Sequence, residues 1–252
     1  MSSLKLTTVR LQRQYLIRIL FQRGIEQMKK LISGLVLLIL LLPLGNPAIG
    51  GSCKDSQDTY SSYDNTVSVN QIKNIPSEYY VLSYSWAPRH CSKVPGKRKM
   101  PGKKDYLQCG SSMRFGYILH GLWPQGAINK PGIYPRACEG DQPKISRKIL
   151  EKYLCMTPSV WLLQHEYEYH GTCMHDEALE SPEIYFSIAM DLHSQLKLPE
   201  KELQYSKESI DWFVMNNPHL SEESIQYYHR GKEWQFCYDN NFNVMPCPKS
   251  VK

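Results

Sequence analysis

The chain has 252 residues, of which 42% are hydrophobic and 21% charged, and its formal net charge is +6. This composition excludes a disordered or collagen-like chain and leaves enough apolar residues for one buried core. The positive surplus lies entirely in residues 1–50, which hold seven cations and one anion. Residues 51–252 are neutral overall, so the whole-chain charge does not indicate a nucleic-acid or membrane partner.

Residues 1–50 have the three parts of a secretory signal. Basic residues precede an apolar stretch at 31–44, and small residues surround Gly50. Because this stretch is shorter than the roughly 20 residues that span a bilayer, we favour a cleaved signal over a permanent transmembrane anchor. We predict a leader at 1–50, cleaved near Gly50 and with Met28 as an alternative start, followed by one functional domain at 51–252.

All eight cysteines follow the predicted leader, and none forms a CxxC pair. An even number of cysteines in an exported chain indicates disulfides, although eight cysteines allow 105 pairings. The lack of CxxC argues against zinc-knuckle and thioredoxin-like functions. We therefore predict a secreted or periplasmic monomer that has no stable membrane association once the signal is removed.

Taken in chain order, strand signals precede helix signals and return at the end. We expect strands at 79–86 and 113–120, a basic loop at 89–104, helices at 145–154, 159–169, 181–197, 209–215 and 222–228, and a closing hairpin of 233–238 with 242–245. The start at 181 is the clearest, since a serine cap is followed by proline and an acidic residue. This order predicts an α+β fold, with a central antiparallel sheet flanked by helices in a single disulfide-stapled domain.

Three histidines have unusual neighbours. His120 ends a predicted strand, and His165 and His170 lie around the end of a predicted helix, with Glu166 beside the first of them. A facing pair of imidazoles can act as base and acid near neutral pH. In RNA, one would take the proton of the ribose 2′-OH as it attacks phosphorus, and the other would protonate the departing 5′-oxygen. The products are a 2′,3′-cyclic phosphate and a free 5′-OH, and the substrate itself supplies the nucleophile.

Two segments resemble the ribonuclease T2 family. ILHGLWP at 118–124 resembles the family's first active-site segment, and HEYEYHGTC at 165–173 resembles its second, in the family's order. The match extends to 80–91, 134–138 and 182–196, so it covers nearly all of the chain after the leader. The resemblance implies an endoribonuclease that acts on single-stranded RNA and needs no cofactor.

The resemblance also implies a role for each matched residue. His170 is implied as the base and His120 as the acid. His165 and Glu166 would stabilise the charged transition state and position the phosphate, although Glu166 has an alternative role in which it only orients its neighbours. Trp123 would bind substrate by offering a face to a base, or it would pack in the core.

One departure from the family pattern concerns charge. The family usually has Lys immediately before the second catalytic histidine, where this chain has Tyr169, which we keep as a substrate-binding candidate. A tyrosine donates only a neutral hydrogen bond, which is weaker than one from a cation. An alternative function is therefore a catalytically weakened protein that binds RNA or a protein partner, unless Arg or Lys from elsewhere compensates. Gln125, where many relatives have Asp, leaves the base preference open.

The family's disulfide habits suggest Cys91 with Cys109, Cys138 with Cys173 and Cys237 with Cys247, which leaves Cys53 with Cys155 by elimination. A zinc protease is a rival function, because HEYEYH resembles HExxH. The histidines here are five residues apart, so their imidazoles diverge on a regular helix, and we predict no metal.

Charge is segregated along the chain. Residues 89–148 carry a net charge of +10, whereas residues 149–252 carry −8. The positive part includes the run Lys97-Arg98-Lys99 and the pair Lys103-Lys104, which form either a solvated surface loop or an RNA contact.

Overall fold

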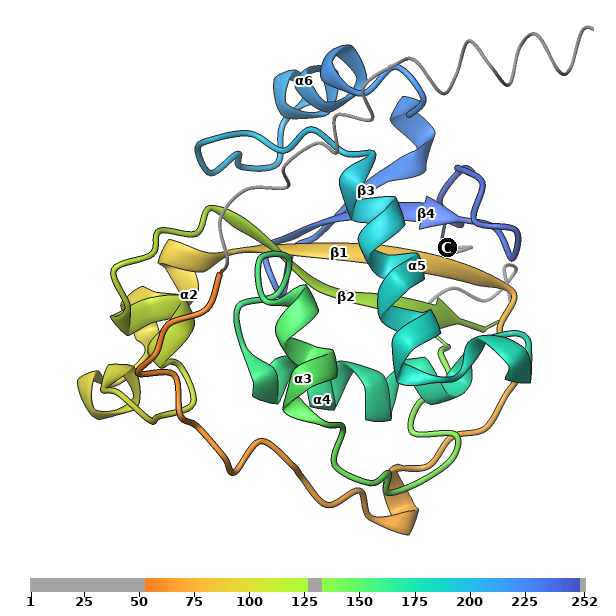
Figure 1. Ribbon diagram of the computed structural model, residues 1–252. Coiled ribbons are helices and arrows are strands. Elements are labelled where there is room, and N and C mark those ends of the chain that lie inside the picture. The colour runs from red at the N-terminus through yellow and green to blue at the C-terminus, as the bar shows by residue number, and fades with distance from the viewer. Residues whose placement is uncertain (1–52, 127–132, 250–252) are drawn as a thin grey trace, which may run out of the picture. The chain divides into compact units, whose positions relative to one another are not determined.

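The computed structural model describes residues 53–126 and 133–249 (Figure 1). The predicted leader at 1–50 lies outside the described residues. The strands are β1 (Tyr79–Trp86), β2 (Tyr117–Gln125), β3 (Ile225–Tyr228) and β4 (Glu233–Tyr238). The α-helices are α2 (Ala87–Lys93), α3 (Arg147–Leu150), α4 (Val160–Tyr169), α5 (Pro182–Ser194) and α6 (Lys207–Asn216). The 3₁₀ turns are η1 (Val69–Gln71), η2 (Gly96–Lys99), η4 (Glu151–Tyr153), η5 (Gly171–Cys173), η6 (Glu177–Leu179) and η7 (Glu222–Ser224), and η3 (Tyr106–Gly110) is a π-helix.

The strands form one antiparallel sheet in the order β2-β1-β4-β3. Alternate residues of β1 face opposite sides, as the period of a strand requires. Leu82 and its alternate neighbours join the helices in the main core, whereas Tyr79 and Val81 pack with Cys237 on the other face. Helix α5 lies across the first of these faces in Figure 1, and its Tyr185 hydroxyl donates to a β2 carbonyl at 2.9 Å.

β2 contains a bulge at His120. Two consecutive residues of β1 pair with Gly121 and Leu119, which leaves His120 without a partner in β1. Leu119 and Leu122 are three residues apart and yet both lie in the helix-covered core. A bulge adds one residue to a strand and changes the direction of its side chain. The side chain of His120 therefore does not follow the regular alternation of side chains along β2.

The segment before α4 holds the bulge in place. The Leu119 amide donates to the Met156 carbonyl at 3.0 Å, and the Thr157 hydroxyl donates to the Leu119 carbonyl at 2.8 Å. Two residues later, the Ser159 hydroxyl accepts from the Leu162 amide and caps α4. The segment immediately before α4 is therefore bonded directly to the strand that carries His120.

All four predicted disulfide pairings are confirmed: Cys53–Cys155, Cys91–Cys109, Cys138–Cys173 and Cys237–Cys247. The bond between Cys138 and Cys173 joins the chain after β2 to the turn that follows α4. It adds a covalent constraint on the relative placement of the two sequence motifs to the hydrogen bonds described above.

The α+β prediction is confirmed, but two boundaries near β1 were wrong. The segment 89–104 is not a plain loop, because α2 and η2 occupy much of it. Pro88 lies in the first turn of α2, where its missing amide costs nothing, so it starts a helix instead of only ending the strand. The second strand begins at Tyr117 and not at 113. Tyr117 pairs with Trp86, which is the last residue of β1, so the residues before Tyr117 have no strand to pair with in the described part of the chain.

Two further predictions failed at the C-terminal end. The segment 222–228 is a 3₁₀ turn followed by β3, and β3, instead of 242–245, is the hairpin partner of β4. Val244 makes only an isolated bridge to Tyr238. A short apolar run fits both the helical and the strand period, and here the pairing with β4 makes the segment a strand.

The helix expected at 145–154 is shorter than predicted, since α3 tightens into the 3₁₀ turn η4.

Within the described ranges, no helix combines the length and apolarity needed to cross a bilayer.

Candidate active site

The two sequence motifs meet at the carboxylate of Glu166. Its Oε1 lies 3.5 Å from Nε2 of His120, and its Oε2 lies 3.8 Å from Nε2 of His170. The indole N–H of Trp123 donates to Oε2 at 2.7 Å. The Trp123 ring also contacts both imidazoles, with centroid distances of 5.0 Å to His120 and 5.5 Å to His170. One buried carboxylate and one indole thus hold both histidines in a single cluster.

Gly121 is required by this arrangement. A Cβ atom at this position would collide with the Glu166 carboxylate and with the indole nitrogen of Trp123. The carboxylate therefore rests directly on the backbone of β2, beside the bulge. No other residue type permits so close an approach.

Glu233, the first residue of β4, is a member of the cluster that the sequence did not indicate. Its Oε1 lies 2.6 Å from Nδ1 of His120, and its Oε2 accepts from the Ser83 hydroxyl at 3.0 Å. Gln235 donates to the same hydroxyl at 3.3 Å. Glu233 is 113 residues from His120, and only the strand order β2-β1-β4 brings them together. No local pattern could have found it.

The two imidazoles differ in proton affinity. Burial resists a positive charge on His120, but the carboxylates of Glu166 and Glu233 outweigh it and raise its pKa to about 9. Burial, together with the neighbouring His165 and His120, holds the pKa of His170 well below its ordinary value. Burial raises the pKa of Glu166 itself to about 7, against the opposing effects of His120 and Trp123. At neutral pH the cluster therefore pairs a protonated imidazole with a neutral one.

His165 lies in a column of rings on one face of α4. Its imidazole stacks on Trp161 at 5.0 Å and 8°, and it contacts Tyr169 at 4.3 Å. The Gln71 amide donates to the Tyr169 hydroxyl. Burial, with the charges of His120 and Lys104, lowers the pKa of His165 to about 4, so this imidazole is neutral near pH 7. It can offer a hydrogen bond to a phosphate, but not a positive charge.

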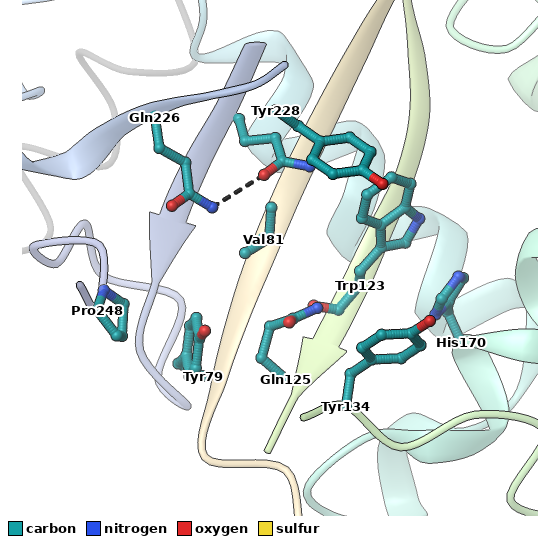
Figure 2. A pocket seen from close by; sticks show the side chains of 10 residues that line it. Tyr79, Val81, Trp123, Gln125, Tyr134, His170, Gln226, Tyr228 and Pro248 are labelled. Atoms are coloured by element: carbon teal, nitrogen blue, oxygen red, sulfur yellow. Dashed lines mark hydrogen bonds between the residues drawn. The ribbon is translucent and has the colours of Figure 1, made fainter. Parts of the chain in front are cut away.

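A cavity of about 400 Å³ opens beside His170 and Trp123, on the sheet face opposite α5 (Figure 2). All four strands contribute to its walls. The lining residues are Tyr79, Val81, Trp123, Gln125, Tyr134, His170, Gln226, Tyr228, Gln235 and Pro248. Gln226 donates to Gln235 at 2.9 Å, which is the dashed line in Figure 2. Aromatic rings with side-chain amides between them suit a flat heterocycle with polar edges.

Among residues 53–126 and 133–249, no three His, Cys, Asp or Glu side chains are placed to hold a metal ion. The cluster instead consists of proton-exchanging groups around a buried carboxylate.

Comparison with known proteins agrees with these features. Residues 77–207 match the model of the ribonuclease T2 family. A probable ribonuclease from Haemophilus influenzae is 34% identical over 202 residues, which cover 78% of this chain and 71% of the relative. A ribonuclease from Aeromonas hydrophila is 34% identical over 96 residues, which cover 38% of this chain and 37% of the relative. In structure, an RNase-related protein from Calystegia sepium matches with a TM-score of 0.50 at 18% identity, over 71% of this chain and 94% of that protein. The chain belongs to the ribonuclease T2 family.

Proposed function

We propose that this protein is an endoribonuclease that cleaves single-stranded RNA by transesterification and leaves 2′,3′-cyclic phosphate ends. The observation that carries the proposal is the pair of imidazoles with opposite proton affinities, whose Nε2 atoms lie 3.5 and 3.8 Å from the oxygens of one carboxylate. A base and an acid held together in this way match the two proton transfers of the reaction.

His170 acts as the base. Its lowered pKa keeps the imidazole neutral near pH 7, and in the tautomer with the proton on Nδ1 the Nε2 atom has a free lone pair for the proton of the ribose 2′-OH. The 2′-oxygen then attacks the adjacent phosphorus. Because the nucleophile and the phosphate belong to the same nucleotide, the attack is intramolecular and the protein needs only to position it.

His120 acts as the acid. Its raised pKa keeps the ring protonated, and Nε2 delivers that proton to the departing 5′-oxygen. Glu233 acts through His120 as a positioning residue, because its 2.6 Å contact with Nδ1 fixes the ring orientation and stabilises the imidazolium.

Charge that develops on the phosphate is met by hydrogen-bond donors. The imidazolium of His120 supplies the positive charge. Glu166, whose pKa is raised to about 7, is protonated in part of the population and can then donate to a phosphate oxygen. The neutral His165 adds a further N–H donor.

The cavity beside His170 receives a base of the RNA strand. Trp123 and Tyr134 offer ring faces, and Gln125, Gln226 and Gln235 offer amide groups to the edges of the base. A base can enter only when it is not paired and stacked in a duplex, so the substrate is single-stranded RNA.

The test uses the protein without its leader on single-stranded RNA in the presence of EDTA, followed by analysis of the 3′ ends. We expect cleavage with cyclic phosphate ends. Cleavage that occurs only with added metal, or 3′ ends that carry a free hydroxyl, would refute the mechanism.

The second candidate is a catalytically weakened protein that binds RNA or a protein partner. Tyr169 favours it, since this residue brings no charge and its hydroxyl is already bonded by Gln71. RNA binding without cleavage by the unaltered protein would support this candidate over the first.

We also infer that the protein is exported. The four disulfides support this, because disulfides form and persist in oxidising compartments.

A further inference from the structure

We propose that Lys104 and Trp161 form a subsite for an RNA phosphate that flanks the reacting one. The inference rests on the proposed function and extends it to a longer strand of RNA. The ligand is a phosphodiester group of the strand that continues beyond the catalytic cluster.

The geometry starts from a well-held turn. Lys104 lies in the segment closed by the Cys91–Cys109 disulfide, and backbone hydrogen bonds link both ends of this turn to neighbouring segments. Its Nζ atom lies over the Trp161 ring, 2.8 Å from the centroid. A lysine ammonium over an indole is a favourable cation–π contact. The cation is thus fixed at one end of the ring column of α4, which continues through His165 to Tyr169.

The cation has no paired carboxylate among the described residues. The neighbouring Asp105 is paired with Arg98 and His90. Within the described part of the chain, no carboxylate oxygen lies within 4.0 Å of the Lys104 amine. Burial and the charge of Arg98 lower its pKa to about 8. A phosphodiester would supply the missing negative charge beside a partly buried ammonium.

The position separates this subsite from the reacting phosphate. Trp161 precedes His170 by nine residues, which corresponds to about 13.5 Å along a helix axis. The charge of Lys104 affects His165 in the middle of the column. The shifts of His120 and His170 arise from other groups. Lys104 is therefore a strand-binding residue and not a catalytic one.

The experiment compares two substrates with Lys104→Gln. A dinucleoside monophosphate contains only the reacting phosphate, whereas an oligonucleotide also has flanking ones. We expect Lys104→Gln to lower kcat/KM on the oligonucleotide through a higher KM, with kcat and the dinucleotide reaction unchanged. Lys104→Arg should restore the lost affinity. Lys103→Gln is the matched control, because Lys103 is exposed on the same turn, and it should affect neither substrate.

A binding measurement tests the subsite independently of RNA cleavage. A labelled single-stranded 2′-deoxy oligonucleotide cannot be cleaved by this chemistry, and its affinity can be measured over a range of salt concentrations. Loss of one phosphate contact should reduce the slope of log affinity against log salt by about 0.7 for Lys104→Gln and not for Lys103→Gln. An equal loss on the dinucleotide, or an unchanged salt slope, would overturn the proposal. If the unaltered protein cleaves no RNA but the slope changes as expected, the proposed function fails and the subsite stands.

Discussion

His120 and His170 are the same side chain in two regions of opposite electrostatic character. His120 projects from a bulge in β2, where Glu166 faces its Nε2 and Glu233 faces its Nδ1. His170 follows the last residue of α4, and its buried Nδ1 has no hydrogen-bond partner among the described residues. Both lie beside Glu166, but within the described part of the chain only His120 has a second carboxylate next to it.

In the proposed mechanism, this difference separates the roles of acid and base. Burial disfavours the charged form of both rings, and on His170 nothing outweighs it. Two carboxylates reverse the effect on His120. Both residues are histidines, so the residue type does not decide whether the ring is protonated. The protonation state depends on the number of anions that the fold places around each ring.

The largest expected effect comes from removing either imidazole. His120→Ala or His170→Ala should lower kcat on single-stranded RNA by about 10² to 10⁴ fold, because each ring supplies one proton transfer in the proposed mechanism. His219→Ala is the control, since His219 is exposed and remote in sequence from both motifs. Initial rates on a labelled RNA would measure the effect. If either variant retained full activity, the paired mechanism would be wrong.

Gly121→Ala disturbs the carboxylate that both rings share. The added methyl group collides with Glu166 and forces it away from the imidazoles. Because a misplacement of about 1 Å can cost about 10² fold in rate, we expect a loss of that order without loss of the fold. Activity should be measured together with the unfolding midpoint. Gly96→Ala is the control, because a Cβ atom there meets nothing within 4 Å.

Glu233→Gln should make the environments of His120 and His170 more alike in charge. It removes one of the two anions that keep His120 protonated, so the pKa of His120 should fall from about 9 toward its ordinary value. The basic limb of kcat/KM against pH should move to lower pH, and a fall of this pKa to about 7 would lower kcat/KM at about pH 8 by roughly tenfold. NMR titration of the His120 ring would measure the same change in pKa without any assay of activity. Glu223→Gln, an exposed residue, should leave the profile unchanged.

The linked effect on stability has a defined sign. Because the folded-state pKa of His120 is raised, its protonation contributes stability that is fully present below the unfolded value of about 6.5 and is lost as the pH rises through about 9. In Glu233→Gln this loss should occur at lower pH. Unfolding midpoints between pH 6 and pH 10 would reveal whether it does.

Tyr169→Lys should have the smallest effect on activity, and it changes the charge next to His170. It brings a cation next to His165, where a charged hydrogen bond would stabilise the phosphate more than a neutral one by about 1 kcal/mol. We therefore expect turnover to rise by about fivefold. Tyr169→Phe, which keeps the ring in contact with His165, separates the effect of charge from that of the hydroxyl. A much larger rise would mark Tyr169 as a residue that suppresses activity and would support the binding-protein alternative.

Much of the fold could be predicted because its signals are local. The strand at 79–86 and the capped helices beginning at 160 and 182 follow from side-chain period, serine caps and a first-turn proline, which act within a few residues. The segment 225–228 was wrongly predicted as part of a helix, because its four residues fit either the helical or the strand period and only the neighbouring β4 stabilises them as a strand.

The sequence by itself determined the candidate histidines and the carboxylate between them, because these residues stand in two short motifs. Only the tertiary structure decided how these side chains are arranged. The bulge that redirects His120, the contact of Glu233 across 113 residues and the placement of Lys104 over Trp161 all depend on strand order and on the packing of distant segments. Proton affinity depends on burial and on nearby charge, and both are properties of the assembled fold.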